Sequence, residues 1–370
     1  MSAPLRLGII GGGQLGRMLA LAAAPLGIRT TVLEPVRNSP AATVARQIIG
    51  NYDDPAALAE LAAASDVVTY EFENISATAA QTLTARVPVF PPPAALIVTQ
   101  DRVIEKTFFG THGIPTAPWA AADSYAALRD AAAQLGYPLI AKTRTLGYDG
   151  RGQQHITAAS DLEIAWRALG GVPLIVEAVV PFVRELSIIA ARGRDGTLLH
   201  YPLIANTHRA GILRRSVVPA PDPDPTTQAT AEAYIARLMT TIGYVGVFTI
   251  ELFELASGQL LANEAAPRVH NSGHWTIEGA ETSQFANHVR AVLGLPLGAT
   301  TLRYGAAGLI NLVGAVPVRE DVLRIAGAAL HLYDKTARPG RKLGHVTVIA
   351  RDHAQLMMRM AMVERLTGTD

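Results

Sequence analysis

The sequence predicts a three-domain protein of mixed α/β and α+β class, with a parallel sheet at the N-terminus, a strand-rich middle and a small β-rich C-terminal domain. Strand-like apolar runs alternate with helical runs over residues 1–98, which favours a parallel sheet covered by helices. Several strands with few helices between them follow over residues 99–298. Short strands and a closing Met-rich helix occupy residues 299–370.

In the N-terminal domain, the apolar spacing predicts three strands and two helices. These elements are the strands Leu5–Ile10, Arg29–Leu33 and Asp66–Tyr70 and the helices Gln14–Leu26 and Pro55–Ala64. Pro88 and the run Pro91–Pro93 cannot lie in a central strand, so they mark the first domain boundary.

The central and C-terminal domains are predicted from the same signals, with a lid subdomain over about residues 115–180. The expected strands are one that ends at Lys142, then Leu174–Ala178, Glu185–Arg192, Ile212–Val218, Ala307–Val313 and His345–Ile349. The expected helices are Ser124–Leu135, Gln228–Ile242 and Ala354–Leu366. We interpret residues 221–225, which alternate Pro and Asp, as a stiff connector.

The composition narrows the functional classes. A net charge of +1 and a pI of about 8.1 argue against a nucleic-acid partner. The absence of Cys excludes disulfides, thiolate nucleophiles and zinc–thiolate sites. No apolar run reaches the roughly 18 residues of a membrane helix, and Arg17 interrupts the apolar N-terminal stretch, so we expect neither a membrane span nor a signal peptide. The cytoplasm is the expected location.

Lysine is rare, since only four of the 32 basic residues are Lys and the others are Arg. Lys142 ends an apolar run before a Gly-rich loop, where a compact cation suits a phosphate oxygen. Lys106 lies at a charged helix start, and we interpret it as an ordinary surface residue.

Two carboxylates are predicted to meet on a β-hairpin. Glu251 closes the run Val247–Ile250, and Glu264 follows Asn263 after the turn Ala256–Gly258. Two acids and an amide suit Mg²⁺, which takes a few hard oxygen ligands and completes its shell with water and phosphates. Arg268, His270 and His274 follow in a polar loop, as expected where a metal-bound phosphate meets a second substrate.

A glycine-rich loop, Gly11–Gly16, follows the first strand and opens a helix, with Glu34 at the end of the next strand. This pattern is typical of a dinucleotide site, although a phosphorylated small molecule fits equally well and the glycines could simply tighten a turn. Glu73 follows the third strand and could face the same ligand as Gln14. A helix-capping role for Asn74 is the equally weighted alternative.

A second glycine-rich loop, Gly147–Gln153, lies between strand-like runs near Lys142. Its backbone amides could cover phosphates, or the loop could be a simple turn. The run Glu177–Val180 and Glu185 suit an adenine pocket and a ribose hydroxyl, although in isolation edge-strand solvation is the favoured explanation. His208 is expected in a loop, where a lone His is usually structural.

Near the C-terminus, cations mix with Gly and Pro between strands. A solvated basic loop is the usual explanation, but this mixture favours a phosphate clamp. The cations are Lys335, Arg338, Arg341 and Lys342.

Together these motifs resemble the ATP-grasp superfamily, and within it the 5-(carboxyamino)imidazole ribonucleotide synthase family, over essentially the whole chain. The runs that carry the resemblance are GGGQLGRM from Gly11, YEFEN from Tyr70, QDR from Gln100, GYDGRGQ from Gly147, NEAAPRVHNSGH from Asn263 and RPGRKLGH from Arg338. Ala205, where a Glu is expected, and Val269, where a second Pro is usual, depart from the family pattern.

The resemblance implies a fold with a Rossmann-like pre-ATP-grasp domain, a central ATP-grasp domain and a small C-terminal domain. It implies an ATP-dependent carbon–nitrogen ligase of purine biosynthesis that converts ATP, bicarbonate and 5-aminoimidazole ribonucleotide to the carbamate, ADP and phosphate, with Mg²⁺. It also implies a homodimer. The Gly11–Gly16 loop is thereby reassigned from a dinucleotide to a nucleotide monophosphate.

By similarity, the ligands divide the site residues into three groups. Those for ATP are Arg102, Lys142, Gly147, Tyr148, Asp149, Gly150, Arg151, Gly152, Gln153, Glu177, Ala178, Val179, Val180, Glu185, His208, Asn263 and Glu264. Those for Mg²⁺ are Glu251 and Glu264. Those for the ribonucleotide are Gln14, Leu15, Glu73, Asn271, Lys335, Arg341 and Lys342.

In the expected mechanism, bicarbonate attacks the γ-phosphate and the resulting carboxyphosphate breaks to CO₂, which the ribonucleotide amine attacks. Arg268 is expected to hold bicarbonate and carboxyphosphate, because its fork matches two oxygens, and the second glycine loop is expected to close as a lid. Asp149, His270 and phosphate itself are candidates for taking the amine proton, and Tyr148 is a further catalytic candidate.

Three alternatives remain open at this point. The nearest is a formate-dependent glycinamide ribonucleotide transformylase of the same superfamily. A nicotinamide dehydrogenase built on the first glycine loop leaves the Glu251/Glu264 pair unexplained. A non-catalytic nucleotide sensor would not need both carboxylates and Arg268.

Overall fold

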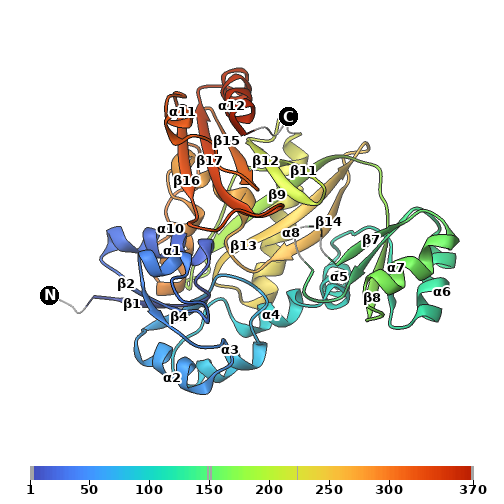
Figure 1. Cartoon of the computed structure of the whole chain (residues 1–370), viewed down its shortest axis with the longest axis horizontal. Coiled ribbons are helices and arrows are strands. Elements are labelled where there is room, and N and C mark those ends of the chain that lie inside the picture. The colour runs from blue at the N-terminus through green and yellow to red at the C-terminus, as the bar shows by residue number, and fades with distance from the viewer. Residues whose placement is uncertain (1–3, 148–149, 151, 223, 368–370) are drawn as a thin grey trace.

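The structure, a computed structural model, describes residues 4–147, 150, 152–222 and 224–367 (Figure 1). The N-terminal part is a parallel sheet of order β3-β2-β1-β4, as predicted. Its strands are β1 (Arg6–Ile10), β2 (Arg29–Leu33), β3 (Arg46–Ile48) and β4 (Val67–Tyr70). Strand β3 was not predicted, because its three residues carry only one apolar side chain.

Four helices accompany this sheet, namely α1 (Gln14–Ala23), α2 (Pro55–Ala63), α3 (Ala77–Thr84) and α4 (Pro93–Thr99). Helix α2 begins where Asp54 accepts a hydrogen bond from the amide of Ala56, with a proline in the first turn. The cap of α3 is Ser76, whose hydroxyl accepts from the amide of Ala79. The capping alternative for Asn74 is therefore wrong.

A smaller antiparallel sheet of order β5-β8-β6-β7 lies within the predicted lid subdomain, so we call it the lid sheet, and it encloses its own hydrophobic core with two helices. The strands are β5 (Trp119–Ala122), β6 (Leu139–Thr143), β7 (Gln153–Ile156) and β8 (Leu174–Ala178), and the helices are α6 (Tyr125–Leu135) and α7 (Leu162–Ala168). Because β8 lies between two strands, the edge-strand explanation for Glu177 is wrong.

The third sheet is antiparallel and combines the central region with the C-terminal region in the order β14-β13-β9-β11-β12-β15-β17-β16, with β10 paired to β9. Its strands are β9 (Phe182–Arg192), β10 (Leu198–His200), β11 (Ile204–Arg209), β12 (Ile212–Val218), β13 (Gly246–Leu255), β14 (Leu260–Ala266), β15 (Ala306–Val313), β16 (Ala328–Leu332) and β17 (Lys342–Ala350). The pairing of β12 with β15 carries this sheet across the expected boundary at residues 298/299.

The helices associated with this sheet include α8, which begins before its predicted start. They are α5 (Arg102–Thr111), α8 (Pro225–Ile242), α9 (Thr276–Gly279), α10 (Gln284–Leu293), α11 (Arg319–Leu323) and α12 (His353–Thr367). Helix α8 begins at Pro225 rather than Gln228, because Asp224 accepts from the amide of Thr226 and Pro225 suits the first turn. Among the described residues, no helix is both long and apolar enough to cross a bilayer.

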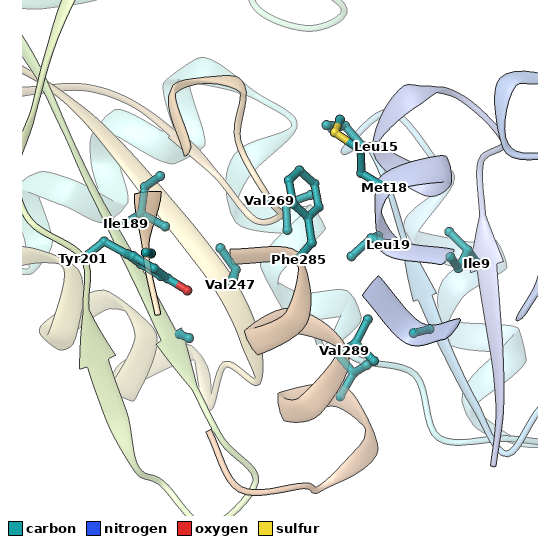
Figure 2. Close-up of a cluster of buried hydrophobic side chains, with 14 of the residues drawn as sticks. Ile9, Leu15, Met18, Leu19, Ile189, Tyr201, Val247, Val269, Phe285 and Val289 are labelled. Atoms are coloured by element: carbon teal, nitrogen blue, oxygen red, sulfur yellow. The ribbon is translucent and has the colours of Figure 1, made fainter. Parts of the chain in front are cut away.

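One hydrophobic core joins the N-terminal sheet to the large sheet (Figure 2). Leu15, Met18 and Leu19 of α1 face Phe285 and Val289 of α10, and the cluster continues to Val247 and Ile189 of the large sheet. Val269, one of the two departures from the family pattern, is fully buried in this core. This packing fixes the N-terminus of α1 beside the strands that carry the candidate site.

Candidate active site

A cavity of about 570 Å³ lies where the N-terminal sheet, the lid sheet and the large sheet meet. Most of the predicted site residues line it. They are Gln14, Leu15, Glu73, Arg102, Lys142, Gly147, Gly150, Gln153, Glu185, His208, Glu251, Asn263, Glu264, Arg268, His270, Asn271, Lys335, Arg341 and Lys342. Tyr148, Asp149 and Arg151 lie outside the described residues.

Five predicted ATP residues do not line this cavity, namely Gly152, Glu177, Ala178, Val179 and Val180. Glu177 is buried instead, and its carboxylate lies 3.0 Å from Nζ of Lys142 and 3.7 Å from Nζ of Lys106. Despite the opposing effect of burial, these cations lower the pKa of Glu177. Lys142 of the lid sheet therefore lines the cavity while its ion pair with the buried Glu177 holds it in place.

Glu251 and Glu264 are direct cross-strand partners on the β13–β14 hairpin, as predicted. Glu251 does not close its strand, however, because β13 continues to Leu255. Burial, followed by the charge of Glu264, raises the pKa of Glu251 to about 7. Glu251 is largely buried and Glu264 is partly exposed. Two neighbouring acids that repel each other form a site that a cation would stabilise. Among the described residues no three His, Cys, Asp or Glu side chains cluster as a metal site, so a cation here would also use Asn263, water or substrate oxygens.

Lys106 is 2% exposed, so its interpretation as a surface residue is wrong. Its Nζ donates to the carbonyl oxygens of Ala262 (3.3 Å) and Asn263 (2.7 Å), which fixes β14 against α5. Its neighbour Glu105 lines the cavity and accepts from the amide of Ala265 at 2.7 Å. Burial, followed by the charge of Glu264, raises the pKa of Glu105 to about 8.

Neither Glu105 nor Lys106 was recognised as part of this region from the sequence. Together with Phe109 they form the buried face of α5, spaced three and four residues apart. That spacing could have predicted their burial from the sequence. The charge of the two side chains favoured a surface position instead.

Arg268 and Glu73 form a bidentate ion pair across the cavity wall. Nη2 of Arg268 lies 3.0 Å from Oε1 of Glu73, and Nε donates to the other carboxylate oxygen. Although burial opposes ionisation, Arg268 lowers the pKa of Glu73. The guanidinium predicted to bind carbonate thus already holds a carboxylate of its own chain.

The Gly11–Gly16 loop binds carboxylates of this chain. The amides of Gly13 and Gly16 donate to Glu71, and the amide of Gly12 donates to Glu34 at 2.9 Å. These are the donors that a dinucleotide pyrophosphate would require, so the dinucleotide interpretation is wrong. The same carboxylates occupy the amides that the reassigned loop would offer to a nucleotide monophosphate. Only the loop edge, at Gln14 and Leu15, reaches the cavity.

The cations near the C-terminus line the end of the cavity next to Gln14, whose Oε1 accepts from Nζ of Lys335. Burial, followed by the charge of Arg341, lowers the pKa of Lys335 to about 8. Lys335, Arg338, Arg341 and Lys342 all line the same space. Their convergence favours an anion site over a solvated basic loop.

His208 lies in strand β11 rather than in a loop, so its predicted setting is wrong. Its Nδ1 is 2.9 Å from Oε2 of Glu185 on the neighbouring strand β9. Burial opposes protonation, but the hydrogen bond with Glu185 gives a net rise in the pKa of His208.

Family models match three successive parts of the chain. A ribonucleotide synthetase preATP-grasp domain matches residues 5–100, an ATP-grasp domain matches residues 107–285, and a phosphoribosylaminoimidazole carboxylase C-terminal domain matches residues 307–359.

Individual relatives match the chain nearly from end to end. The N5-carboxyaminoimidazole ribonucleotide synthase of Pseudomonas aeruginosa is 48% identical, over 98% of this chain and 99% of the relative. The crystal structure of the Thermus thermophilus synthetase is 48% identical and superposes with a TM-score of 0.93, over 98% of each chain. That of the Aspergillus clavatus synthase in complex with ADP and 5-aminoimidazole ribonucleotide is 32% identical and superposes with a TM-score of 0.92, over 99% of each chain.

Proposed function

This chain belongs to the N5-carboxyaminoimidazole ribonucleotide synthase family of ATP-grasp enzymes, and on that premise we propose which role each of its site residues has in the reaction. It is an ATP-dependent ligase that carboxylates 5-aminoimidazole ribonucleotide in purine biosynthesis. The comparisons do not favour the formate-dependent transformylase alternative. The carrying observation is that one cavity joins the Glu251/Glu264 pair, Arg268 and the C-terminal cations.

Glu251 and Glu264 are the proposed ligands of Mg²⁺, with Asn263 beside them. The support is their cross-strand register and the raised pKa of Glu251, which together describe an acid pair that a cation would stabilise. When bound, Mg²⁺ would neutralise charge on the β- and γ-phosphates of ATP. Lys142 reaches the same space from the lid and Arg102 lies 3.6 Å from Glu264, so both can meet the phosphates.

Arg268 is the proposed holder of bicarbonate and then of carboxyphosphate. A bicarbonate oxygen attacks the γ-phosphorus as ADP leaves, and the carboxyphosphate then breaks to CO₂ and phosphate. Arg268 holds the carboxylate of Glu73 in the fork geometry that a planar carbonate also requires. When the carbonate binds Arg268, the carboxylate of Glu73 would leave Arg268 and contact the ribonucleotide instead.

The ribonucleotide is proposed to place its 5′-phosphate against Lys335, Arg338, Arg341 and Lys342. Gln14, Asn271 and Glu73 line the same cavity. The amine nitrogen attacks CO₂, which forms the carbamate and releases one proton. We further propose a homodimer in the cytoplasm, which sedimentation velocity and cell fractionation would test.

The test is ADP release by the purified protein in CO₂-depleted buffer with each substrate omitted in turn. We expect release only when ATP, a divalent cation, bicarbonate and 5-aminoimidazole ribonucleotide are all present. The variant Glu251→Gln should lose this activity. Equal ADP release with formate and glycinamide ribonucleotide, or bicarbonate-independent turnover, would contradict the proposal.

A further inference from the structure

We propose that a buried chain of Ser272, Ser187, Asn206 and Ser216 holds His270 in the tautomer that carries its proton on Nε2, so that His270 donates to Glu251 and orients its carboxylate. These four residues are then positioning residues for the carboxylate pair. The inference rests on the proposed metal role of Glu251 for its functional consequence, but not for the tautomer itself.

The chain is continuous from the cavity into the centre of the large sheet. Nδ1 of His270 is 2.8 Å from the hydroxyl of Ser272, which is 2.8 Å from that of Ser187. The amide of Asn206 donates to Ser187 at 3.0 Å, and the hydroxyl of Ser216 donates to Oδ1 of Asn206 at 2.7 Å. Each link is within hydrogen-bond distance.

The strands place these side chains in a row. Ser187 on β9 is the cross-strand partner of Glu251 on β13, and Ser216 on β12 is the partner of Asn206 on β11. Ser272 lies in the short turn Asn271–Gly273 that covers the row. The three serines are fully buried and Asn206 is 8% exposed. Buried hydroxyls are retained at little net cost only when each has a partner, and here each has one.

The tautomer follows from a contact with a backbone amide, a group that donates hydrogen bonds and cannot accept them. The backbone amide of Ser272 also donates to Nδ1 of His270, at 3.3 Å, so Nδ1 must carry the lone pair. The neutral ring then has its proton on Nε2, which lies 3.3 Å from Oε1 of Glu251.

This arrangement assigns His270 a role other than accepting the amine proton. Nδ1 already accepts from Ser272, and Nε2 already carries a proton. One oxygen of Glu251 is held by His270, which leaves the other to face a cation. Partners of this kind set the orientation of metal-binding carboxylates, and their loss typically lowers metal affinity about 10- to 100-fold.

The tautomer is tested by ¹⁵N spectra of the intact protein labelled at histidine, with the His270 signals assigned by their loss in His270→Gln. We expect an unprotonated Nδ1 and a protonated Nε2 at neutral pH. A proton on Nδ1, or a charged ring, would overturn the inference whatever the metal does.

The functional consequence is tested by Mn²⁺ affinity in the presence of ADP, measured from the signal of free Mn²⁺. We expect Ser272→Ala and Ser187→Ala to weaken binding about 10-fold. Testing Ser272 and Ser187 separately keeps the experiment decisive if one of the two variants fails to fold. The matched control is Thr249→Val, because Thr249 is a buried residue of β13 whose hydroxyl has no partner. The inference fails if both serine variants bind Mn²⁺ as tightly as this control.

Failure of the proposed function gives a different result. If Glu251→Gln binds Mn²⁺ with ADP as tightly as the unmodified protein, the metal assignment is wrong. The ¹⁵N spectra would still decide the tautomer.

Discussion

Arg268 and Glu73 illustrate how single residues acquire a function from their partners. Each was predicted to contact a ligand, and the structure places them in contact with each other. A buried guanidinium needs a fork-shaped anion, and Glu73 supplies one until a carbonate can replace it. Exchange between two carboxylate-like anions therefore keeps Arg268 paired with an anion throughout.

The variant Arg268→Ala should lower the rate of carbamate formation by a factor of 100 or more, by analogy with the loss of one donor to a reacting oxyanion, at roughly 10²–10³. Nucleotide binding should persist, because Lys142 and the lid residues are unchanged. Turnover and ADP affinity measured on the same preparation check this. Unchanged turnover would show that Arg268 does not hold the carbonate.

Lys106 is the residue whose burial most contradicts its sequence-based interpretation. The variant Lys106→Met should reduce the free energy of unfolding by about 3–5 kcal/mol, because Glu177 and two carbonyl oxygens lose a buried partner. Urea denaturation measures this change. Arg167→Met is the matched control, since its ion pair with Glu163 is exposed and its loss should have little effect. Equal effects of the two substitutions would refute the anchoring role.

At the scale of elements, the site is assembled by segments far apart in the sequence. The segment between β16 and β17, together with the first residue of β17, carries four cations to the N-terminus of α1, where Lys335 meets Gln14. Hairpin β13–β14 was predicted from its turn and from its acids, because both signals are local. The position of His208 in β11 was not predicted, because that strand mixes polar and apolar residues.

The pKa of Lys335, lowered to about 8, predicts how ribonucleotide binding depends on pH. The charged amine binds phosphate, so the KM for the ribonucleotide should rise as the pH increases through about 8. Lys335→Gln should raise this KM at neutral pH and remove the inflection, while the KM for ATP stays nearly constant. A pH profile of both KM values from 6.5 to 9.5 measures this.

Lys342→Ala, at the first residue of β17, serves as a comparison within the same group of cations. It should also raise the KM for the ribonucleotide far more than that for ATP. It should keep the inflection but move it to a higher pH, because the charge of Lys342 helps to lower the pKa of Lys335. Equal increases in both KM values would place the cation group away from the ribonucleotide.

On the scale of the whole molecule, the N-terminal sheet and the large sheet are held together by a shared core and by a few buried polar contacts. His288 of α10 accepts from the amide of Val247 on β13 and lies 2.8 Å from the hydroxyl of Thr69 on β4. It therefore connects the N-terminal sheet to the large sheet at a fully buried position. Burial lowers the pKa of His288 to about 3.

This pKa predicts an acid-dependent loss of stability. Between pH 6.5 and about 3 the unfolded chain binds a proton at His288 that the folded protein does not, so stability falls as the pH decreases, by up to about 1.4 kcal/mol per pH unit. His288→Gln should reduce this slope. Unfolding free energies from pH 4 to pH 7 measure the slope, which a simple packing defect would leave unchanged.

The sequence by itself determined the class of fold, the order of the domains and most of the residues that line the cavity. These features depend on local signals, namely the period of apolar residues, turn glycines and motifs whose members are neighbours in the chain. Only the tertiary structure decided which charges meet, as in Arg268 with Glu73, Lys106 with Glu177 and the first glycine loop with Glu71. Burial and pairing depend on segments up to 321 residues apart, whose approach no local pattern records.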